Sequence, residues 1–188
     1  PKKYSVLAHL SSPPLSMLIK KMLKTSDNMY ADAIFKTLGA KYYQQTGTWQ
    51  NSEKALEKIL SKSAHIQFKR ALITDGCGLS RYNLISPNQL MNLLTFAFHN
   101  KKIKPALLAS LPIANQDGTL KYRFGELGND NSVRAKTGTM HGVSTLAGFY
   151  KKKNGNMRAF VIMINNFVGK STPFRAIEDN IITTLANQ

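Results

Sequence analysis

Asn131-Ser-Val-Arg-Ala-Lys-Thr-Gly-Thr-Met140 is the stretch that most constrains the fold. Small apolar residues alternate with polar ones, which is typical of a β-strand with one buried face, and we predict a strand at 132–140. Two more strands are predicted at 143–150 and 158–167, and Asn154-Gly155 between them is a strong hairpin signal. The last third of the chain therefore predicts an antiparallel sheet, with Lys136-Thr137-Gly138 on its first strand.

Helical spacing of apolar residues dominates the chain before this sheet. Gly39 is interpreted as the C-cap of the second helix and Ser52 as the N-cap of the third. This order of elements predicts an α+β domain with helices packed on an antiparallel sheet. The other expected elements are a strand at Tyr4–Leu10, helices at 13–25, 29–38, 52–62, 86–99 and 104–110, one turn at 119–124, and a terminal helix from Pro173.

Composition limits the class of protein. The 188 residues are 43% apolar and 19% charged, which suits one globular domain. The net charge of +16 favours an anionic partner or surface, but the lysines are scattered, so we prefer a solvated basic surface. We expect no nucleic acid partner, because there is no basic helix, aromatic RNA-binding sequence or Cys/His finger. No apolar run approaches the roughly 20 residues of a transmembrane helix.

Cys77 is the only cysteine, which excludes an internal disulfide and a multi-cysteine zinc site. We expect no metal and no cofactor. A thiol site is an alternative, but no pattern places a histidine beside Cys77. Asp75 and Arg81 are interpreted as structural residues of the glycine-containing loop around it. The histidines considered as partners are His65, His99 and His141.

Ser26-Asp27-Asn28 lies between two predicted helices, where a rigid scaffold can present side chains to a ligand. The second Ser-x-Asn, Ser86-Pro87-Asn88, is explained as a helix cap followed by proline. Ser-Asp-Asn and Lys-Thr-Gly are two of the three active-site motifs of penicillin-binding proteins and class A β-lactamases, and they occur here in the expected order.

The chain resembles the C-terminal part of the D-alanyl-D-alanine carboxypeptidase/endopeptidase family, the class C low-molecular-mass penicillin-binding proteins (peptidase family S13-like). This resemblance implies a DD-peptidase/β-lactamase-like fold, with an antiparallel sheet flanked by helices on both faces, incomplete in this chain. Residues 1–188 would be the C-terminal portion of one DD-peptidase (transpeptidase-like) domain. The supporting segments are Ser26–Ala31, Asp75–Arg81, Leu84–Pro87 and Val133–Thr139.

The third motif is missing, because no serine in the sequence is followed three residues later by lysine. In the resembled family, Ser-x-x-Lys lies near the N-terminus, and inserted domains separate it from Ser-x-Asn. The chain begins with Pro1, without Met or a signal-like segment. We therefore expect an upstream part of the same protein to supply the nucleophile, and we expect these residues alone to be inactive.

The resemblance also implies roles for individual residues. Ser26 would relay a proton towards the leaving amine, and Asn28 would hydrogen-bond the acylated side of the substrate. Lys136 would set the electrostatic field near Ser26 and attract the terminal carboxylate of D-Ala-D-Ala. The expected substrate-binding residues on the same strand are Thr137, Gly138 and Thr139.

The expected function is that of a serine-type D-alanyl-D-alanine carboxypeptidase/endopeptidase acting on peptidoglycan stem peptides in the periplasm or cell envelope. β-Lactam antibiotics would be its inhibitors. One alternative is a β-lactamase-like hydrolase, although no Glu-x-x-x-Asn segment lies between Ser26 and Lys136 to position a deacylating water. The other is a non-catalytic cell-wall-binding or scaffold module that keeps the cleft without a nucleophile.

Overall fold

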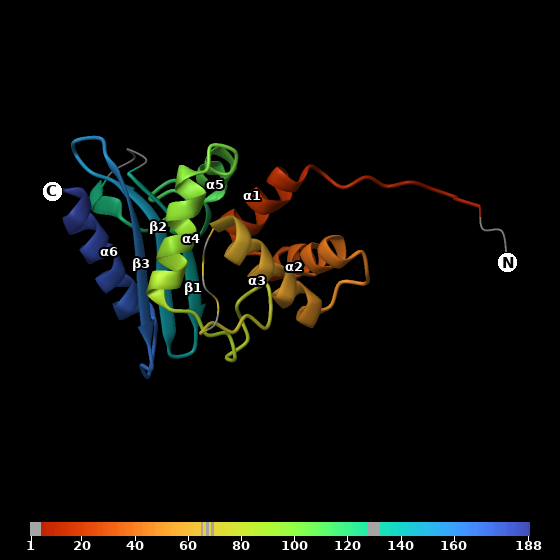
Figure 1. The fold of residues 1–188 in the computed structure, drawn as a ribbon. Coiled ribbons are helices and arrows are strands. Elements are labelled where there is room, and N and C mark those ends of the chain that lie inside the picture. Colours follow the sequence, from red (N-terminus) through yellow and green to blue (C-terminus); the bar gives the residue numbers. More distant parts are fainter. Residues whose placement is uncertain (1–4, 65, 67, 69, 128–131) are drawn as a thin grey trace.

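Figure 1 shows a computed structural model in which a three-stranded sheet stands between one helix and a block of helices. It describes residues 5–64, 66, 68, 70–127 and 132–188. The elements, in chain order, are α1 (Leu15–Thr25), α2 (Asn28–Tyr43), α3 (Trp49–Ala64), α4 (Pro87–His99), α5 (Lys104–Ser110), the 3₁₀ turns η1 (Gly118–Leu120) and η2 (Gly125–Leu127), β1 (Val133–Met140), β2 (Val143–Lys151), β3 (Met157–Asn165) and α6 (Thr172–Ala186).

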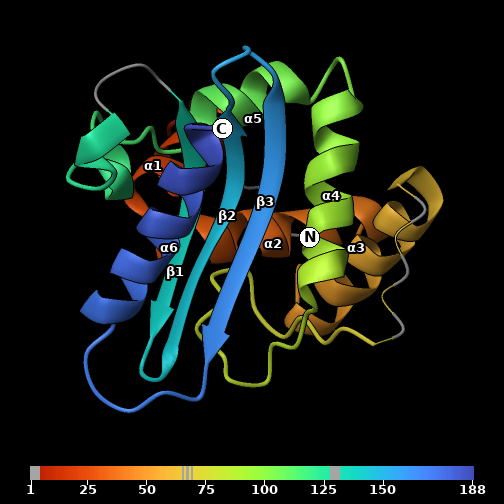
Figure 2. The ribbon, with the colours of Figure 1, turned by 90° about the vertical axis from the view of Figure 1, so that its left-hand side faces the viewer.

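The sheet has the order β1-β2-β3, and both strand pairs are antiparallel. Helix α6 covers one face of the sheet and α4 covers the other, as Figures 1 and 2 show. The predicted α+β fold, with helices on both faces of an antiparallel sheet, is therefore confirmed. No described helix is long and apolar enough to cross a membrane.

Alternation along the strands divides the core into two layers. Val133 and Ala135 of β1 are fully buried and pack with Ile182 of α6. On the other face, Phe149 of β2 packs with Leu94 of α4. The side chains of β1 at even positions therefore point away from α6, and Lys136 is one of them.

Only part of the outer edge of β1 is covered in the described structure. The N–H of Ala135 donates to the carbonyl of Pro112, and the carbonyl of Val133 accepts from the N–H of Ala114. These bonds cover the start of the strand. The edge from Lys136 to Met140 faces the junction between α1 and α2, and this stretch carries the Lys-Thr-Gly motif.

The strand expected at Tyr4–Leu10 is not found. Tyr4 lies outside the described residues, and 5–10 form no secondary structure. Figure 1 shows this segment extending away from α1. A strand needs a partner for its backbone groups, and no described segment pairs with 5–10, which leaves Leu7 and Leu10 each 96% exposed.

The expected caps at Gly39 and Ser52 are also wrong. Helix α2 continues to Tyr43, and α3 begins at Trp49, before Ser52. Ser52 is fully buried against α2, and a Cβ on Gly39 would lie 2.5 Å from its Oγ. Gly39 therefore lies inside α2 at the point where α3 packs closely against it. A glycine near the expected end of a helix looked like a C-cap in the sequence, but it does not end this helix. By contrast, the predicted cap at Ser86 is confirmed, since its hydroxyl accepts from the N–H of Gln89.

Candidate active site

The α1–α2 junction holds Ser26 in an unusual conformation. Ser26 ends α1 in the left-handed region, with φ 54° and ψ 50°, and its N–H donates to the carbonyl of Met22. The left-handed conformation raises the conformational free energy of a non-glycine residue by roughly 1–2 kcal/mol. The sharp turn at Ser26 is therefore strained. Asp27 then caps α2 by accepting a hydrogen bond from the N–H of Tyr30 at 3.1 Å. The predicted tight junction at Ser26–Asn28 is confirmed.

Lys136 lies directly against this junction, 110 residues further along the chain. Its Nζ donates to Ser26 Oγ at 2.7 Å and to the carbonyl oxygen of Thr137 at 2.6 Å. The two sequence motifs therefore meet in space. The cavity between them has a volume of about 530 Å³ and is bounded by the junction, by residues 76–79 and by 136–140 of β1.

Burial lowers the pKa of Lys136, because the charged ammonium has lost part of its hydration. Its hydrogen bonds hold the amine at Ser26, which is itself exposed to solvent. A lysine of lowered pKa beside a hydroxyl can pass a proton through that hydroxyl. The pair therefore has the geometry of a proton relay that opens onto the cavity.

The other predicted site residues are placed around the same cavity. Asn28, Thr137, Gly138 and Thr139 all line it. The hydroxyl of Thr137 donates to Thr119 Oγ1 at 2.9 Å. The predicted residues are thus brought together, while their roles towards a substrate stay predictions.

The wall opposite β1 is a loop that two carboxylates hold in place. Asp32 of α2 accepts from the N–H groups of Gly76 and Cys77, and Asp75 accepts from those of Gly78 and Ser80. Asp75 is therefore a structural residue, as predicted. A Cβ on Gly76 would lie 2.6 Å from the carbonyl oxygen of Ala31, so glycine lets the loop lie against α2.

Arg81 ties the end of this loop to the sheet, because its Nη2 donates to the carbonyl oxygen of His141 at 2.8 Å. This hydrogen bond accounts for the structural role that the sequence predicted for Arg81. His99 lines a separate cavity beside α4, and His65 lies outside the described residues. Cys77 lines the candidate site, and no described contact joins it to a histidine.

We predict that Cys77 is a slow thiol. Burial raises its pKa, and the nearby charges of Asp75 and Asp32 add to the effect. Since the thiolate is the reactive form, alkylation by iodoacetamide should reach its half-maximal rate at a higher pH in the folded protein than in urea. A half-maximal pH equal to or below that of the unfolded protein would contradict this prediction.

Two contributors to this site were missed in the sequence. Asp32 lies one helical turn after Asn28, so its place on the same face of α2 was readable from spacing alone. Arg175 of α6 donates to Thr139 Oγ1 at 3.3 Å, which places a second cation near the end of β1. No local signal marks Arg175, because only the packing of α6 on the sheet brings it there.

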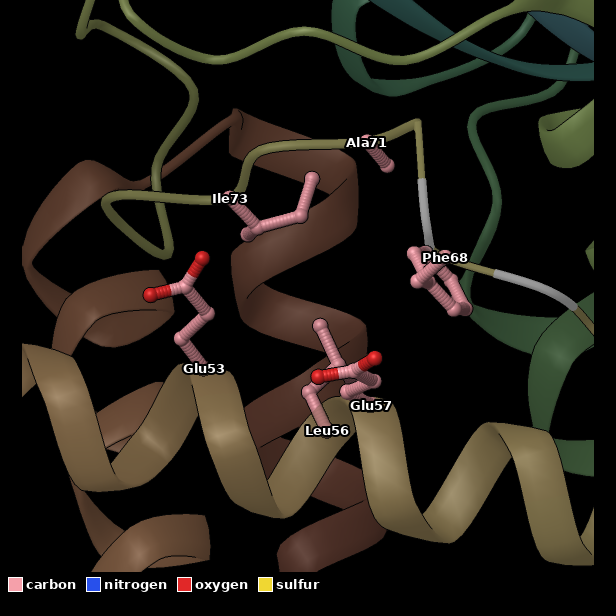
Figure 3. A pocket seen from close by; sticks show the side chains of 6 residues that line it. All are labelled: Glu53, Leu56, Glu57, Phe68, Ala71 and Ile73. Atoms are coloured by element: carbon pink, nitrogen blue, oxygen red, sulfur yellow. The ribbon is translucent and has the colours of Figure 1, made fainter.

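Figure 3 shows a different pocket, in which Glu53 and Glu57 of α3 lie near Ile73 and Phe68. Two carboxylates one helical turn apart could serve acid–base chemistry. However, the space is only about 30 Å³, which is the volume of a single water molecule. This pocket is too small for a substrate, and the cleft at Lys136 is the better candidate.

The sequence profile of the D-Ala-D-Ala carboxypeptidase 3 (S13) family matches residues 1–188. The chain is 38% identical over 169 residues to D-alanyl-D-alanine carboxypeptidase DacB of Haemophilus influenzae, covering 89% of this chain and 35% of that protein. It is 33% identical over 189 residues to D-alanyl-D-alanine carboxypeptidase of an Actinomadura species, covering 96% of this chain and 34% of that protein. The chain thus spans about a third of the length of these relatives.

Solved structures agree with this match. The crystal structure of penicillin binding protein 4 (dacB) from Haemophilus influenzae, complexed with a β-lactam, superposes with a TM-score of 0.84 at 34% identity. The match covers 93% of this chain and 42% of that one. The TLA-3 extended-spectrum β-lactamase, at 19% identity and a TM-score of 0.63, shares the fold. The profile match over the full length of the sequence shows that this chain belongs to the D-Ala-D-Ala carboxypeptidase 3 (S13) family.

Proposed function

We propose that the protein is a serine-type D-alanyl-D-alanine carboxypeptidase whose nucleophile comes from a Ser-x-x-Lys segment upstream of Pro1. In this proposal, residues 1–188 form the C-terminal portion of the DD-peptidase domain. The observation that carries it is the contact of Lys136 Nζ with Ser26 Oγ inside a substrate-sized cavity. The names of the relatives point to the same activity.

The proposed chemistry is acyl transfer to the upstream serine. Its hydroxyl passes its proton to the lysine of the same Ser-x-x-Lys segment, and its Oγ attacks the carbonyl carbon of the penultimate D-Ala and forms an ester, while the amide C–N bond breaks. The departing nitrogen needs a proton, which Ser26 supplies from its hydroxyl. Lys136 then returns a proton to Ser26 Oγ across the 2.7 Å hydrogen bond. Water finally hydrolyses the ester and frees the serine, and the proton taken up by the Ser-x-x-Lys lysine restores the protonated Lys136.

The open edge of β1 suits an extended peptide. Backbone groups alternate in direction along a strand, and those of Val133 and Ala135 point outward to residues 112–114. The N–H and C=O of Thr139 therefore point outward too, where they can pair with a substrate backbone. The cations of Lys136 and Arg175 favour a terminal carboxylate at this edge.

An apolar groove between α1 and α2 supports completion by an upstream segment. It has a volume of about 820 Å³ and lies beside Pro13 and Leu15, where the chain enters α1. Leu15 is 59% exposed and Met29 is 78% exposed, although both are large apolar residues. Covering such side chains is favourable by about 25 cal/mol per Å².

Peptidoglycan stem peptides ending in D-Ala-D-Ala are the proposed substrates, and β-lactams the proposed inhibitors. The periplasm or cell envelope is the proposed location, because that is where this substrate occurs. A β-lactamase-like activity would differ in the lifetime of its acyl-enzyme, and a scaffold would form no acyl-enzyme at all.

A fluorescent penicillin distinguishes these possibilities. The full-length protein with its upstream sequence should form a stable labelled adduct at the Ser-x-x-Lys serine and should release D-Ala from a tripeptide ending in D-Ala-D-Ala. Replacing that serine with alanine should abolish both signals. Rapid turnover of the penicillin would indicate a β-lactamase, and absence of both labelling and release would indicate a scaffold. Stable labelling of Ser26 would contradict the upstream nucleophile.

A further inference from the structure

One end of the sheet gathers two basic segments that lie far apart in the sequence. Figure 2 shows the α4–α5 connection and the β2–β3 turn at the same end, opposite to the β1–β2 turn. We call this the basic end. Its seven cationic residues are Lys101, Lys102, Lys104, Lys151, Lys152, Lys153 and Arg158.

A cavity of about 450 Å³ lies next to these segments, between the last turn of α4 and the β2–β3 hairpin. Phe98 and His99 line it from α4, and Asn156 and Arg158 line it from the β2–β3 hairpin. The Nζ of Lys104 lies 3.7 Å from the centre of the Phe98 ring, which brings the α5 side to the same cavity. The basic end therefore has a hollow that Arg158 lines and that Lys104 reaches at the Phe98 ring, and the five other lysines lie on the adjoining segments.

Acidic residues are missing from the segments that build this end. No Asp or Glu occurs in 87–116 or in 132–177. Within the described residues, the ion pairs are formed by Lys24 and Arg123, which lie elsewhere. Lys102, Lys153 and Arg158 are exposed to solvent. Their charges therefore add to one positive field, which favours a ligand with several negative charges.

We infer that the basic end binds a flexible polymer of phosphodiester groups, seated between α4 and the β2–β3 hairpin. Six of the seven cations are lysines, which act on phosphate as mobile point charges, whereas arginine favours fixed bidentate geometry. Such contacts suit a chain with repeated charges and no fixed shape. The polymer would hold the protein beside its substrate while leaving the cleft at Lys136 free.

Two other polyanions fit less well. An anionic membrane surface attracts a basic patch, but stable binding also needs apolar side chains that enter the bilayer. The turn Lys151–Asn156 has none, and the α4–α5 connection carries only Ile103. Single-stranded nucleic acid needs free aromatic faces for base stacking. Phe98 offers little of this, because Lys104 covers its ring and Phe149 lies 5.2 Å away.

The test compares two variants that lose the same charge. The first replaces Lys102, Lys153 and Arg158 with glutamine. The second variant also carries three changes to glutamine, at the exposed lysines Lys20, Lys54 and Lys62, which lie on α1 and α3. Binding of the full-length protein to poly(glycerol phosphate) is measured by fluorescence anisotropy over a series of salt concentrations, and melting curves check that both variants fold.

The affinity of the first variant for poly(glycerol phosphate) should be at least about tenfold lower than that of the wild type. The affinity of the second variant should stay within about twofold of the wild-type value. The slope of log affinity against log salt should fall by about two units in the first variant, as expected for three lost phosphate contacts. The tripeptide carboxypeptidase activity should be unchanged in both. Equal weakening in both variants, no binding at all, or tighter binding to phosphatidylglycerol vesicles or single-stranded DNA would overturn the inference.

Discussion

Replacing Lys136 with alanine should slow acylation of the full-length protein by penicillin about 10²–10³-fold. The substitution removes the donor that holds Ser26 Oγ and the cation facing the open edge of β1. Loss of one preorganised donor in an active site typically has an effect of this size, about 10²–10³-fold in rate. The measurement is the second-order rate constant for labelling with a fluorescent penicillin.

Urea unfolding of a Lys136 variant shows whether slower acylation reflects lost catalysis or a misfolded protein. Burial lowers the pKa of Lys136, so the charged amine is disfavoured in the folded state. Lys136→Met should therefore unfold at the same or a higher urea concentration than the wild type at neutral pH. As pH rises above the lowered pKa, the folded wild type loses its proton first and gains stability relative to the variant until the ordinary lysine pKa is passed.

Two controls complete the test of Lys136. Lys170→Ala removes an exposed lysine outside the cleft and should leave acylation unchanged. Lys136→Arg keeps the positive charge but cannot give up a proton near neutral pH, so it should rescue carboxylate binding and not proton transfer. A wild-type acylation rate in Lys136→Ala would show that this lysine has no part in the reaction.

Arg123→Ala should lower the free energy of unfolding by about 3–5 kcal/mol, because it leaves a buried carboxylate without its cation. Arg123 Nη2 donates to Glu178 Oε2 at 2.9 Å and to Asp179 Oδ1 at 2.6 Å. Glu178 is fully buried, and among the described residues the side-chain hydrogen bond that it keeps once the arginine is gone is the one from Ser144 Oγ. Urea unfolding of the wild type and the variant measures the loss.

The matched control is Arg158→Ala, an exposed arginine on β3, which should change the free energy of unfolding by less than about 0.5 kcal/mol. Adding Glu178→Gln to Arg123→Ala should recover part of the loss, since it removes the unpaired charge. A loss below about 1 kcal/mol in Arg123→Ala would mean that the ion pair behaves like one on the surface.

The ion pairs of Arg123 also support residues that line or adjoin the candidate active site. Arg123 follows η1, which carries Thr119, and its partners lie in α6, which carries Arg175. Thr119 and Arg175 contact Thr137 and Thr139 of β1. Loss of Arg123 should therefore disturb the side of the cleft that faces α6, as well as the packing of that helix on the sheet.

Local patterns predicted most secondary structure correctly where the chain itself supplies the reason. The first strand was predicted from alternation, the hairpin of the other two was supported by Asn154-Gly155, and the cap at Ser86 was predicted from its hydroxyl and the following proline. The errors arose where contacts with another segment of the chain determine the local structure. Residues 5–10 have a strand-like sequence and no strand to pair with, and Gly39 serves the contact with Ser52 instead of ending its helix.

The sequence alone determined the two motifs, their order, and the elements on which they lie. Hydrogen bonding and apolar periodicity act over a few residues, so these features are readable from the chain. The family resemblance implied that Lys136 lies near Ser26, but only the tertiary structure gave the hydrogen bond between them, brought Arg175 to Thr139, and placed the β2–β3 hairpin beside the last turn of α4. Such contacts depend on how helices pack against the two faces of the sheet, and no local spacing encodes a meeting of residues 110 positions apart.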